Sequence, residues 1–181
     1  MNCAGQRGLT LAELMVALVI AGIVSAGAVP AFGALRDSTA GAITRSSITG
    51  SFAFARSHAL RSRERVVVCP SASGSTCDAT SDWTHGWIVF LDRANAKQPG
   101  GVHDVVQRFA PLPDGVRALT TNGRPLVRFM PDGRAWGTNL TLRLCSARGL
   151  VMGRVVLSNS GRVRYDPAQT SMPCTSSQNP A

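Results

Sequence analysis

Hydrophobic residues follow three successive patterns along the chain. Residues 9–32 read LTLAELMVALVIAGIVSAGAVPAF, an apolar run of 24 residues whose single charge is Glu13. As a helix, this run would be about 36 Å long, enough to cross a hydrocarbon core of about 30 Å. Small and aliphatic side chains surround the whole helix, so we expect it to be buried in a membrane or among other chains.

Further along, apolar residues recur first at helical spacing and then at strand spacing. One set lies at i, i+4, i+7 and i+11, which predicts an amphipathic helix packed on a sheet. This set is Ile48, Phe52, Ala55 and Ala59. Together with the apolar run, it predicts one long N-terminal helix over residues 9–63. From Arg65 onward, apolar and polar positions alternate with the period of strands.

Seven segments have the strand period. They are Arg65–Cys69, Gly86–Leu91, Val105–Phe109, Leu126–Met130, Leu140–Cys145, Gly153–Leu157 and Arg162–Tyr165. Turn-forming sequences separate them, such as Pro-Asp-Gly at 113–115 and 131–133. Short strands without intervening helices indicate an antiparallel sheet or a small sandwich. The predicted fold class is α+β, a long N-terminal helix packed on a C-terminal antiparallel β-sheet or sandwich domain over residues 64–181.

Three interpretations of the apolar run compete. The first is a plain transmembrane anchor, and the second is a secretory signal peptide with Ala26-Gly27-Ala28 as its small-x-small cleavage site. Glu13 argues against both, because a carboxylate inside an apolar run costs about 2.5–3.5 kcal/mol on insertion scales and normally pairs with a functional partner. The third interpretation accounts for this carboxylate.

The segment Gly8-Leu9-Thr10-Leu11-Ala12-Glu13 resembles the class III signal of type IV pilins and type II secretion pseudopilins. In these proteins a short leader ends in Gly, an apolar residue follows, and a Glu stands at mature position five. The resemblance implies that residues 1–8 are the leader and that a prepilin peptidase cuts between Gly8 and Leu9. Leu9 stands where the family usually has an N-methylated Phe, and Pro30 where it commonly has a helix-kinking proline.

The same resemblance assigns Glu13 a role in assembly. In the family, this carboxylate neutralises the N-terminal amine of a neighbouring subunit, and a buried charge is tolerable when its partner is delivered with it. Residues 9–32 would lie in the inner membrane before assembly and in the filament core afterwards, with other pilins as partners. Arg7 would remain in the cytoplasm and the C-terminus would lie in the periplasm, as the positive-inside rule predicts. The implied localisation is the inner membrane, single-pass, and then the cell-surface pilus.

Three segments of the body are similar to motifs of the GspH/FimT group of minor pilins and pseudopilins. They are ARSHA at 55–59, VVVCPS at 66–71 and WTHGWIVFLD at 83–92. In that group a helix end, a V-x-x-C-P strand and a W-x-x-G-W-x-V-F-x-D strand occur in this order. The resemblance therefore covers nearly the whole chain, and it implies a long helix packed on a β-rich domain.

The number of cysteines fits a domain that is translocated across the membrane into an oxidising compartment. Cys3 would leave with the leader, and the four that remain indicate two disulfides in an oxidising compartment. Of three possible pairings, we favour Cys69–Cys77, which closes a short loop, and Cys145–Cys174, which ties the tail to a late strand. A zinc site is the alternative, but there is no C-x-x-C pair and the three histidines are scattered. We expect no metal, no cofactor and no enzymatic activity, because no catalytic motif is present.

The charge is strongly basic and unevenly distributed. The 18 Arg and one Lys outnumber ten acidic residues, for a formal net charge of +9. Nine arginines but only two acids fall between Arg117 and Asp166. Such an excess of guanidinium groups favours an anionic partner, which could be nucleic acid, acidic lipid or an acidic protein. A GC-rich genome, whose codons favour Arg over Lys, is the alternative explanation.

One motif favours DNA as this partner. Residues 158–165 read SNSGRVRY, similar to the G-R-x-R motif by which FimT-type pilins bind DNA in natural transformation. In a strand, Arg162 and Arg164 would project from one face with Cβ atoms about 6.5–7 Å apart, close to the phosphate spacing of one DNA strand. Gly161 permits a turn and a close approach of the backbone to phosphate. The alternative is that both arginines are only the solvated face of an edge strand.

The sequence thus predicts a non-enzymatic minor type IV pilin that binds extracellular DNA for uptake. The candidate DNA-binding residues are Gly161, Arg162, Arg164, Arg154, Arg148 and Arg143. Contacts would be made to the phosphate backbone, since no base-reading motif is apparent. Among possible base-stacking residues, Trp87 is expected in the core and Trp136 on the surface. The alternative function is a structural or priming minor pilin, or a type II secretion pseudopilin, without DNA binding.

Overall fold

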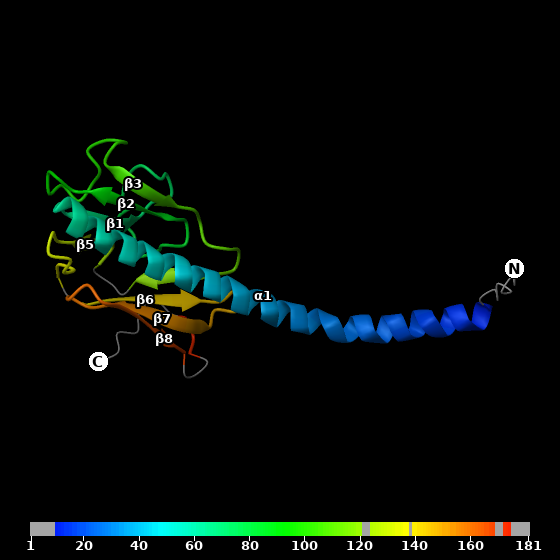
Figure 1. Cartoon of the computed structure of the whole chain (residues 1–181). Helices are drawn as coiled ribbons and strands as arrows, with labels where there is room; N and C mark the ends of the chain where they lie inside the picture. Colours follow the sequence, from blue (N-terminus) through cyan, green and yellow to red (C-terminus); the bar gives the residue numbers. More distant parts are fainter. Residues whose placement is uncertain (1–9, 121–123, 138, 169–171, 175–181) are drawn as a thin grey trace, which may run out of the picture. The chain divides into compact units, whose positions relative to one another are not determined.

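The computed structural model describes residues 10–120, 124–137, 139–168 and 172–174, with only the backbone of 24, 26–32 and 34 (Figure 1). Within these ranges the chain forms one long helix and eight strands. They are α1 (Leu11–Ser62), β1 (Val66–Pro70), β2 (Trp87–Leu91), β3 (Val105–Phe109), β4 (Arg117–Thr120), β5 (Val127–Phe129), β6 (Leu140–Cys145), β7 (Val151–Leu157) and β8 (Val163–Pro167). The chain divides into two compact units, residues 1–38 and residues 39–181.

The first unit contains the N-terminal part of α1, which begins with a reciprocal cap. The amide N–H and the hydroxyl of Thr10 donate to Oε2 of Glu13 over 3.2 and 3.3 Å, and the Glu13 amide lies 3.3 Å from the Thr10 hydroxyl oxygen. This arrangement is a capping box, which satisfies N–H groups that a helix start leaves without partners. Glu13 therefore has a partner within its own chain. The predicted cleavage site at Gly8 and Leu9 lies outside the described residues.

Large apolar side chains are exposed along this part of α1. Leu11 is 77% exposed, and Leu18 and Ile23 are each 69% exposed. Exposed apolar surface of this kind marks a site of interaction. Within the part of the chain that the structure describes, no helical stretch combines the length and hydropathy of a membrane span. Pro30 belongs to the residues whose side chains are not described.

The second unit combines the rest of α1 with two four-stranded antiparallel sheets, counted over the described residues. Sheet A has the strand order β3-β2-β1-β5, and sheet B has the order β4-β6-β7-β8. From residue 39 onward, the helix packs against both sheets (Figure 1). The α+β architecture predicted from the sequence is confirmed.

The predicted apolar stripe of α1 is the centre of the core. All four of its residues are 0% exposed and pack with side chains from both sheets. Trp83 and Trp87 are buried beside the stripe, at 0% and 1% exposure. The Trp83 ring meets Phe52 edge to face at 5.8 Å, and Trp87 stacks on Phe109 at 5.1 Å. The prediction that Trp87 belongs to the core is confirmed.

Most strands lie where the alternating pattern predicts them, but β4 is absent from the prediction. Its buried positions are Ala118 and Thr120, while Arg117 is exposed. A small residue and a polar residue make a weak apolar signal, although each faces the interior here. β8 begins at Val163, so Arg162 precedes the strand by one residue.

Two disulfides join the cysteine pairs favoured from the sequence. Cys69 in β1 is bonded to Cys77 in the following loop, with Cα atoms 5.5 Å apart. Cys145 at the end of β6 is bonded to Cys174, with Cα atoms 6.0 Å apart. The first attaches the loop after β1 to sheet A, and the second attaches the tail to sheet B.

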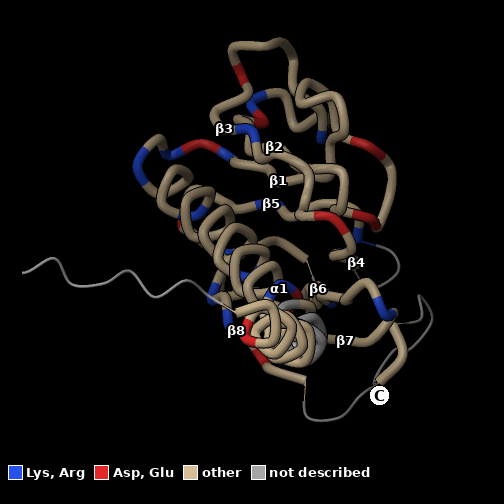
Figure 2. The backbone as a smooth tube through the Cα atoms, turned by 90° about the vertical axis from the view of Figure 1, so that its right-hand side faces the viewer, with Lys and Arg blue, Asp and Glu red and all other residues tan. Residues whose placement is uncertain are grey.

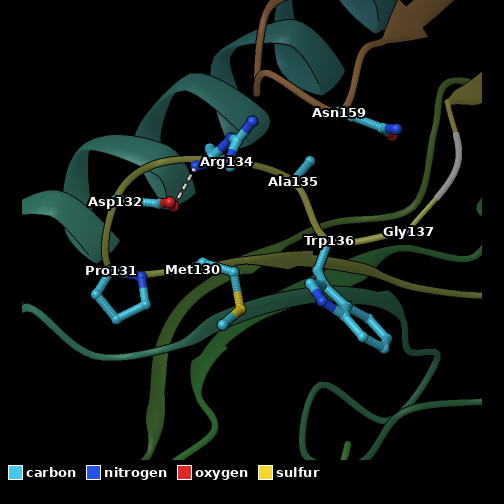
Figure 3. Close-up of a pocket in the computed structure, with 8 residues that line it drawn as sticks. All are labelled: Met130, Pro131, Asp132, Arg134, Ala135, Trp136, Gly137 and Asn159. Carbon is cyan, nitrogen blue, oxygen red and sulfur yellow. Dashed lines mark hydrogen bonds between the residues drawn. The ribbon is translucent and has the colours of Figure 1, made fainter.

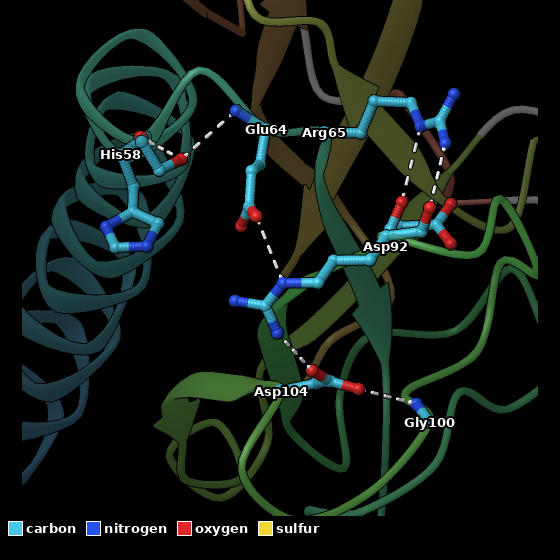
Figure 4. Close-up of polar contacts among 8 residues, drawn as sticks. His58, Glu64, Arg65, Asp92, Gly100 and Asp104 are labelled. Carbon is cyan, nitrogen blue, oxygen red and sulfur yellow. Dashed lines mark hydrogen bonds and ion pairs between the residues drawn. The ribbon is translucent and has the colours of Figure 1, made fainter.

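Charged contacts connect the end of α1 to the loop after β2 (Figure 4). Nε of Arg93 lies 3.0 Å from Oε1 of Glu64, and Nη1 lies 2.8 Å from Oδ1 of Asp104. The hydrogen bond to Glu64 and the charge of that carboxylate raise the pKa of Arg93 above its ordinary value. Deeper in the fold, the buried carboxylate of Asp92 lies 3.6 Å from Nη2 of Arg128. Removing one partner of a buried pair leaves an uncompensated charge, so this pair is costly to break.

Candidate nucleic-acid interface on the second sheet

Sheet B faces the core with one side and turns its other side outward. Val155 in β7 is buried in the core, so its neighbours Arg154 and Val156 project from the opposite face, because successive side chains alternate. The antiparallel register sets Arg143 of β6 beside Arg154, and Arg164 of β8 beside Val156. Arginines from three strands are thereby brought to the outer face of sheet B.

Arg162 and Arg164 line a groove at one end of this face. Both are exposed, and Val163 between them packs against the core, as strand alternation predicts. The groove has a volume of about 280 Å³. Its lining consists of Asn139, Val156, Ser158, Ser160, Arg162 and Arg164, and we call it the arginine groove. These described lining residues offer guanidinium, hydroxyl and amide groups but no carboxylate, a chemistry suited to phosphate oxygens.

The two guanidinium groups differ in their neighbours. Nε of Arg164 lies 3.5 Å from Oδ1 of Asp166, and the two side chains are 67% and 37% exposed. An exposed pair of this kind contributes about 0–1 kcal/mol, so a phosphate can compete with Asp166. Arg162 is held through its backbone N–H, which donates to the Ser158 hydroxyl over 3.3 Å. Among the described residues, no hydrogen bond or ion pair engages its guanidinium.

Gly161 is buried, contrary to the expectation that its backbone approaches phosphate. Its φ of +76° permits a turn in which its N–H donates to the Ser158 carbonyl over 2.9 Å. An added Cβ would collide with the carbonyl oxygen of Gly133 and lie 3.2 Å from Nε of Arg56. Gly161 is therefore required for the conformation of the turn and for its close packing against Gly133. Its effect on the candidate interface is indirect, because the turn positions Arg162.

Three of the candidate arginines do not line the groove. Arg143 is buried, with only 7% of it exposed, and it lies on β6, an interior strand of sheet B between β4 and β7. The prediction that Arg143 offers its charge to a phosphate is therefore corrected. Arg148 is exposed in the β6–β7 turn, at the end of that hairpin opposite to the groove. Arg154 is half-buried and faces Asp166 in the register, which leaves Arg162 and Arg164 as the accessible pair.

The Lys and Arg residues as a whole are distributed over several parts of the described chain (Figure 2). Arg128 is neutralised by Asp92. Arg124 is half-buried, and burial lowers the pKa of its guanidinium, which donates to the Trp136 carbonyl. The count of charges in the sequence thus overstates the accessible basic surface. In the described part of the chain, no cluster of three His, Cys, Asp or Glu side chains could hold a metal ion.

A second concave site lies beside the arginine groove. It has a volume of about 500 Å³ and is lined by residues 130–132, 134–137 and Asn159 (Figure 3). Its largest side chain is Trp136, which is 65% exposed, as expected from the sequence. Figure 3 shows the indole pointing away from α1, whereas Arg134 points toward that helix. We call this site the tryptophan hollow.

Sequence reasoning missed the polar side chains that complete the groove. Ser158 and Ser160 are adjacent to the G-R-V-R segment and could have been identified as turn residues. Asn139 comes from the loop before β6, and its Oδ1 accepts the Asn159 N–H over 3.1 Å. No local pattern links residues that far apart in the chain, so only the register of sheet B brings Asn139 to the groove.

The long helix packed on antiparallel sheets is the architecture of the type IV pilins and pseudopilins. A family model described as "Type II transport protein GspH" matches residues 44–161, about two thirds of the chain. A second model, "Prokaryotic N-terminal methylation motif", matches residues 3–29, which include the predicted cleavage site and Glu13. The chain belongs to the GspH family of minor pilins and pseudopilins. Membership in this class implies processing by a prepilin peptidase and assembly with other pilins.

Solved structures share this fold at low sequence identity. Two crystal forms of the type IV minor pilin FimU from Pseudomonas aeruginosa PAO1 align with TM-scores of 0.58 and 0.55, each at 15% identity. The alignments cover 77% and 76% of this chain and 96% and 99% of the FimU chains. At this identity, the likeness establishes the fold alone. No curated protein matches the sequence.

Proposed function

We propose that this chain is a minor type IV pilin, most like FimT, which binds extracellular DNA for uptake in natural transformation. The observation that carries the proposal is the arginine groove. There, Arg162 and Arg164 lie exposed on the same side of the chain, and the rest of the lining offers hydroxyl and amide groups. In this proposal the protein acts by binding and catalyses no reaction.

Geometry and charge favour phosphate as the ligand. Side chains two residues apart in a strand lie about 6.5–7 Å apart, which is about the spacing of phosphates along one DNA strand. Each guanidinium offers paired N–H donors that match phosphate oxygens. Arg154 adds positive charge from β7, while Asp166 removes some. Two accessible phosphate contacts predict weak, sequence-independent binding that declines as salt is raised.

The proposal is tested by fluorescence anisotropy of labelled duplex DNA with the full chain in nonionic detergent. Replacing Arg162 and Arg164 together by Gln should lower the affinity about tenfold, because two exposed charge contacts of about 0.7 kcal/mol each amount to about 1.4 kcal/mol. The fold should be unchanged, since both side chains are exposed.

A matched control removes two positive charges elsewhere. Arg63 follows α1 and Arg117 begins β4; both are exposed, and neither lines the groove. The Arg63→Gln/Arg117→Gln variant has the same net charge as the groove variant, Arg162→Gln/Arg164→Gln. It should retain most of the DNA affinity, because neither replaced side chain lines the groove. Equal losses in the two variants would mean that net charge, and not the groove, determines binding, and would contradict the proposal.

We propose that the N-terminal part serves membrane insertion and assembly. Cleavage after Gly8 makes Leu9 the first residue, and residues 9–32 lie in the inner membrane before assembly, with the body in the periplasm. Glu13, which here caps its own helix through Thr10, exchanges that partner for the N-terminal amine of a neighbouring subunit. Glu13→Gln should leave the fold of residues 39–181 intact and abolish incorporation into sheared pili, measured by immunoblot. Incorporation at the wild-type level would contradict this role.

A structural role is the second candidate, as a priming minor pilin or a type II secretion pseudopilin. Two observations favour it: the matching family is named for a type II transport protein, and Arg164 already has Asp166 as a partner. In this case the groove variant and the unmodified chain bind DNA equally weakly, and deletion of the protein impairs pilus assembly or secretion instead of DNA uptake.

A further inference from the structure

Trp136 differs from the other two tryptophans in its exposure. It is 65% exposed, whereas Trp83 and Trp87 are 0% and 1% exposed. Placing a large indole in water forgoes the stabilisation that its burial would contribute, and Tyr or Trp surfaces of this kind are typical of binding sites. The chemistry around the ring indicates what it binds.

The main chain at Trp136 is fixed on both sides of the residue. Its N–H donates to the Arg128 carbonyl over 2.8 Å, and its carbonyl accepts a hydrogen bond from the Arg124 guanidinium. The guanidinium carbon of Arg128 lies 5.9 Å from the centre of the indole, within cation–π range, and Arg128 is itself held by Asp92. The ring is thus backed by a buried cation while most of its surface remains exposed. Such a platform needs little further ordering when a ligand binds.

The tryptophan hollow adjoins the arginine groove. One turn, residues 158–161, separates them: Ser158 and Ser160 line the groove, and Asn159 lines the hollow. This turn is hydrogen-bonded on both sides. The Asn159 carbonyl accepts the Ala135 N–H over 2.9 Å, and the Asn159 N–H donates to Asn139 over 3.1 Å. A ligand that extends over this turn would therefore contact both sites.

The linings of the two sites suit different parts of one ligand. The hollow presents apolar surface from Met130, next to the indole, and from Pro131. It also contains Arg134 and the carboxylate of Asp132, whose Oδ1 accepts the Arg134 N–H over 2.9 Å (Figure 3). A carboxylate repels phosphate but accepts hydrogen bonds from the amino and imino groups of a base. The volume of the tryptophan hollow, about 500 Å³, lies within the range of about 300–1,000 Å³ typical of sites for organic ligands. The groove differs in having two arginines and no carboxylate among its described lining residues, whereas in the hollow Arg134 is accompanied by Asp132.

We propose that Trp136 stacks on an unpaired base of single-stranded DNA whose phosphates lie in the arginine groove. The proposal rests on the proposed function and specifies its ligand. Bases in a duplex already stack on one another and cannot reach an indole, whereas the bases of a single strand can stack on it. The protein therefore binds single-stranded DNA more tightly than duplex DNA at the same salt concentration.

The test uses the full chain in nonionic detergent, with an oligothymidine of about 16 nucleotides, the upper end of common site sizes, and a duplex of equal length. Trp136→Ala should weaken single-strand binding at least about fivefold, the effect of losing one stacked base. Duplex binding should stay unchanged. Trp136→Phe, which keeps a stacking face, should restore most of the single-strand affinity. In the unmodified chain, the oligothymidine should quench the exposed indole fluorescence, and the duplex should not.

The outcomes separate this inference from the proposed function. Unchanged single-strand affinity in Trp136→Ala, with duplex binding intact, overturns the stacking role and leaves the groove in place. Equal losses for both DNA forms also overturn it, because stacking on an unpaired base cannot act on a duplex. If neither DNA form binds the unmodified chain, the proposed function fails and this inference fails with it. Selective loss of single-strand affinity, rescued by Phe, supports it.

Discussion

Replacing Gly161 by alanine tests whether the glycine of the G-R-V-R segment is required by the fold. Its φ of +76° lies in the left-handed region, and an added Cβ would collide with the carbonyl oxygen of Gly133. Gly149 offers a matched control, because its φ is +72° but no atom lies within 4 Å of the position of its Cβ. The two glycines have nearly the same backbone conformation and differ in the space around them.

The expected losses of stability follow from the backbone conformation of each glycine and from the space around it. A residue other than glycine in the left-handed region costs about 1–2 kcal/mol. Forcing extra atoms into a packed site adds about 1–3 kcal/mol. Gly149→Ala should therefore lower the free energy of unfolding by about 1–2 kcal/mol, and Gly161→Ala by about 2–5 kcal/mol.

Urea unfolding of residues 39–181 with the disulfides intact measures both values. The fluorescence of the buried Trp83 and Trp87 reports the loss of the core, and the shift of the midpoint at constant slope gives the change in stability. Equal destabilisation by the two alanines would show that Gly161 is not packed tightly against Gly133. The conclusion that this glycine has a structural role would then be refuted.

Two further substitutions test the charge arrangement. Asp166→Asn removes the acidic partner of Arg164, so the affinity for duplex DNA at low salt should rise by up to about fivefold, the equivalent of about 1 kcal/mol. Weaker binding in the anisotropy assay would contradict the competition between Asp166 and phosphate. Asp92→Asn leaves Arg128 buried without its counter-charge, so the free energy of unfolding in urea should fall by about 3–5 kcal/mol. A variant as stable as the unmodified chain would show that this ion pair is dispensable.

Much of the fold could be predicted from the sequence because local periodicity decides it. The stripe from Ile48 to Ala59 follows helical geometry, and its residues are buried in the core. Most strands have β-branched or aromatic side chains at the buried positions, as in β1 and β2. β4 could not be found in this way, since Ala118 and Thr120 contribute little apolar signal despite their burial.

The candidate site was predictable only in part. Alternation within a strand is local, so the exposure of Arg162 and Arg164 on one side follows from the sequence alone. The burial of Arg143 depends on its strand lying inside the sheet, and the sequence does not specify strand order. The capping box at Thr10 also has a local signal, the T-x-x-E pattern of Thr10 and Glu13.

The tryptophan hollow depends on contacts between distant segments. Trp136 and the 158–161 turn lie side by side because the Asn159 carbonyl accepts the Ala135 N–H. No pattern within either segment indicates the other. The burial of Gly161 has the same origin, since the group it approaches, the Gly133 carbonyl, belongs to another turn.

The salt dependence of duplex binding tests the role of the arginine groove most directly. A plot of log affinity against log salt concentration counts the phosphates that the protein neutralises, at about −0.9 per phosphate on a duplex. Replacing Arg162 and Arg164 by Gln should reduce the steepness of this plot by about 1.8, whereas the Arg63→Gln/Arg117→Gln control should keep the original slope. An unchanged slope in the groove variant would show that these two guanidinium groups do not contact DNA phosphates.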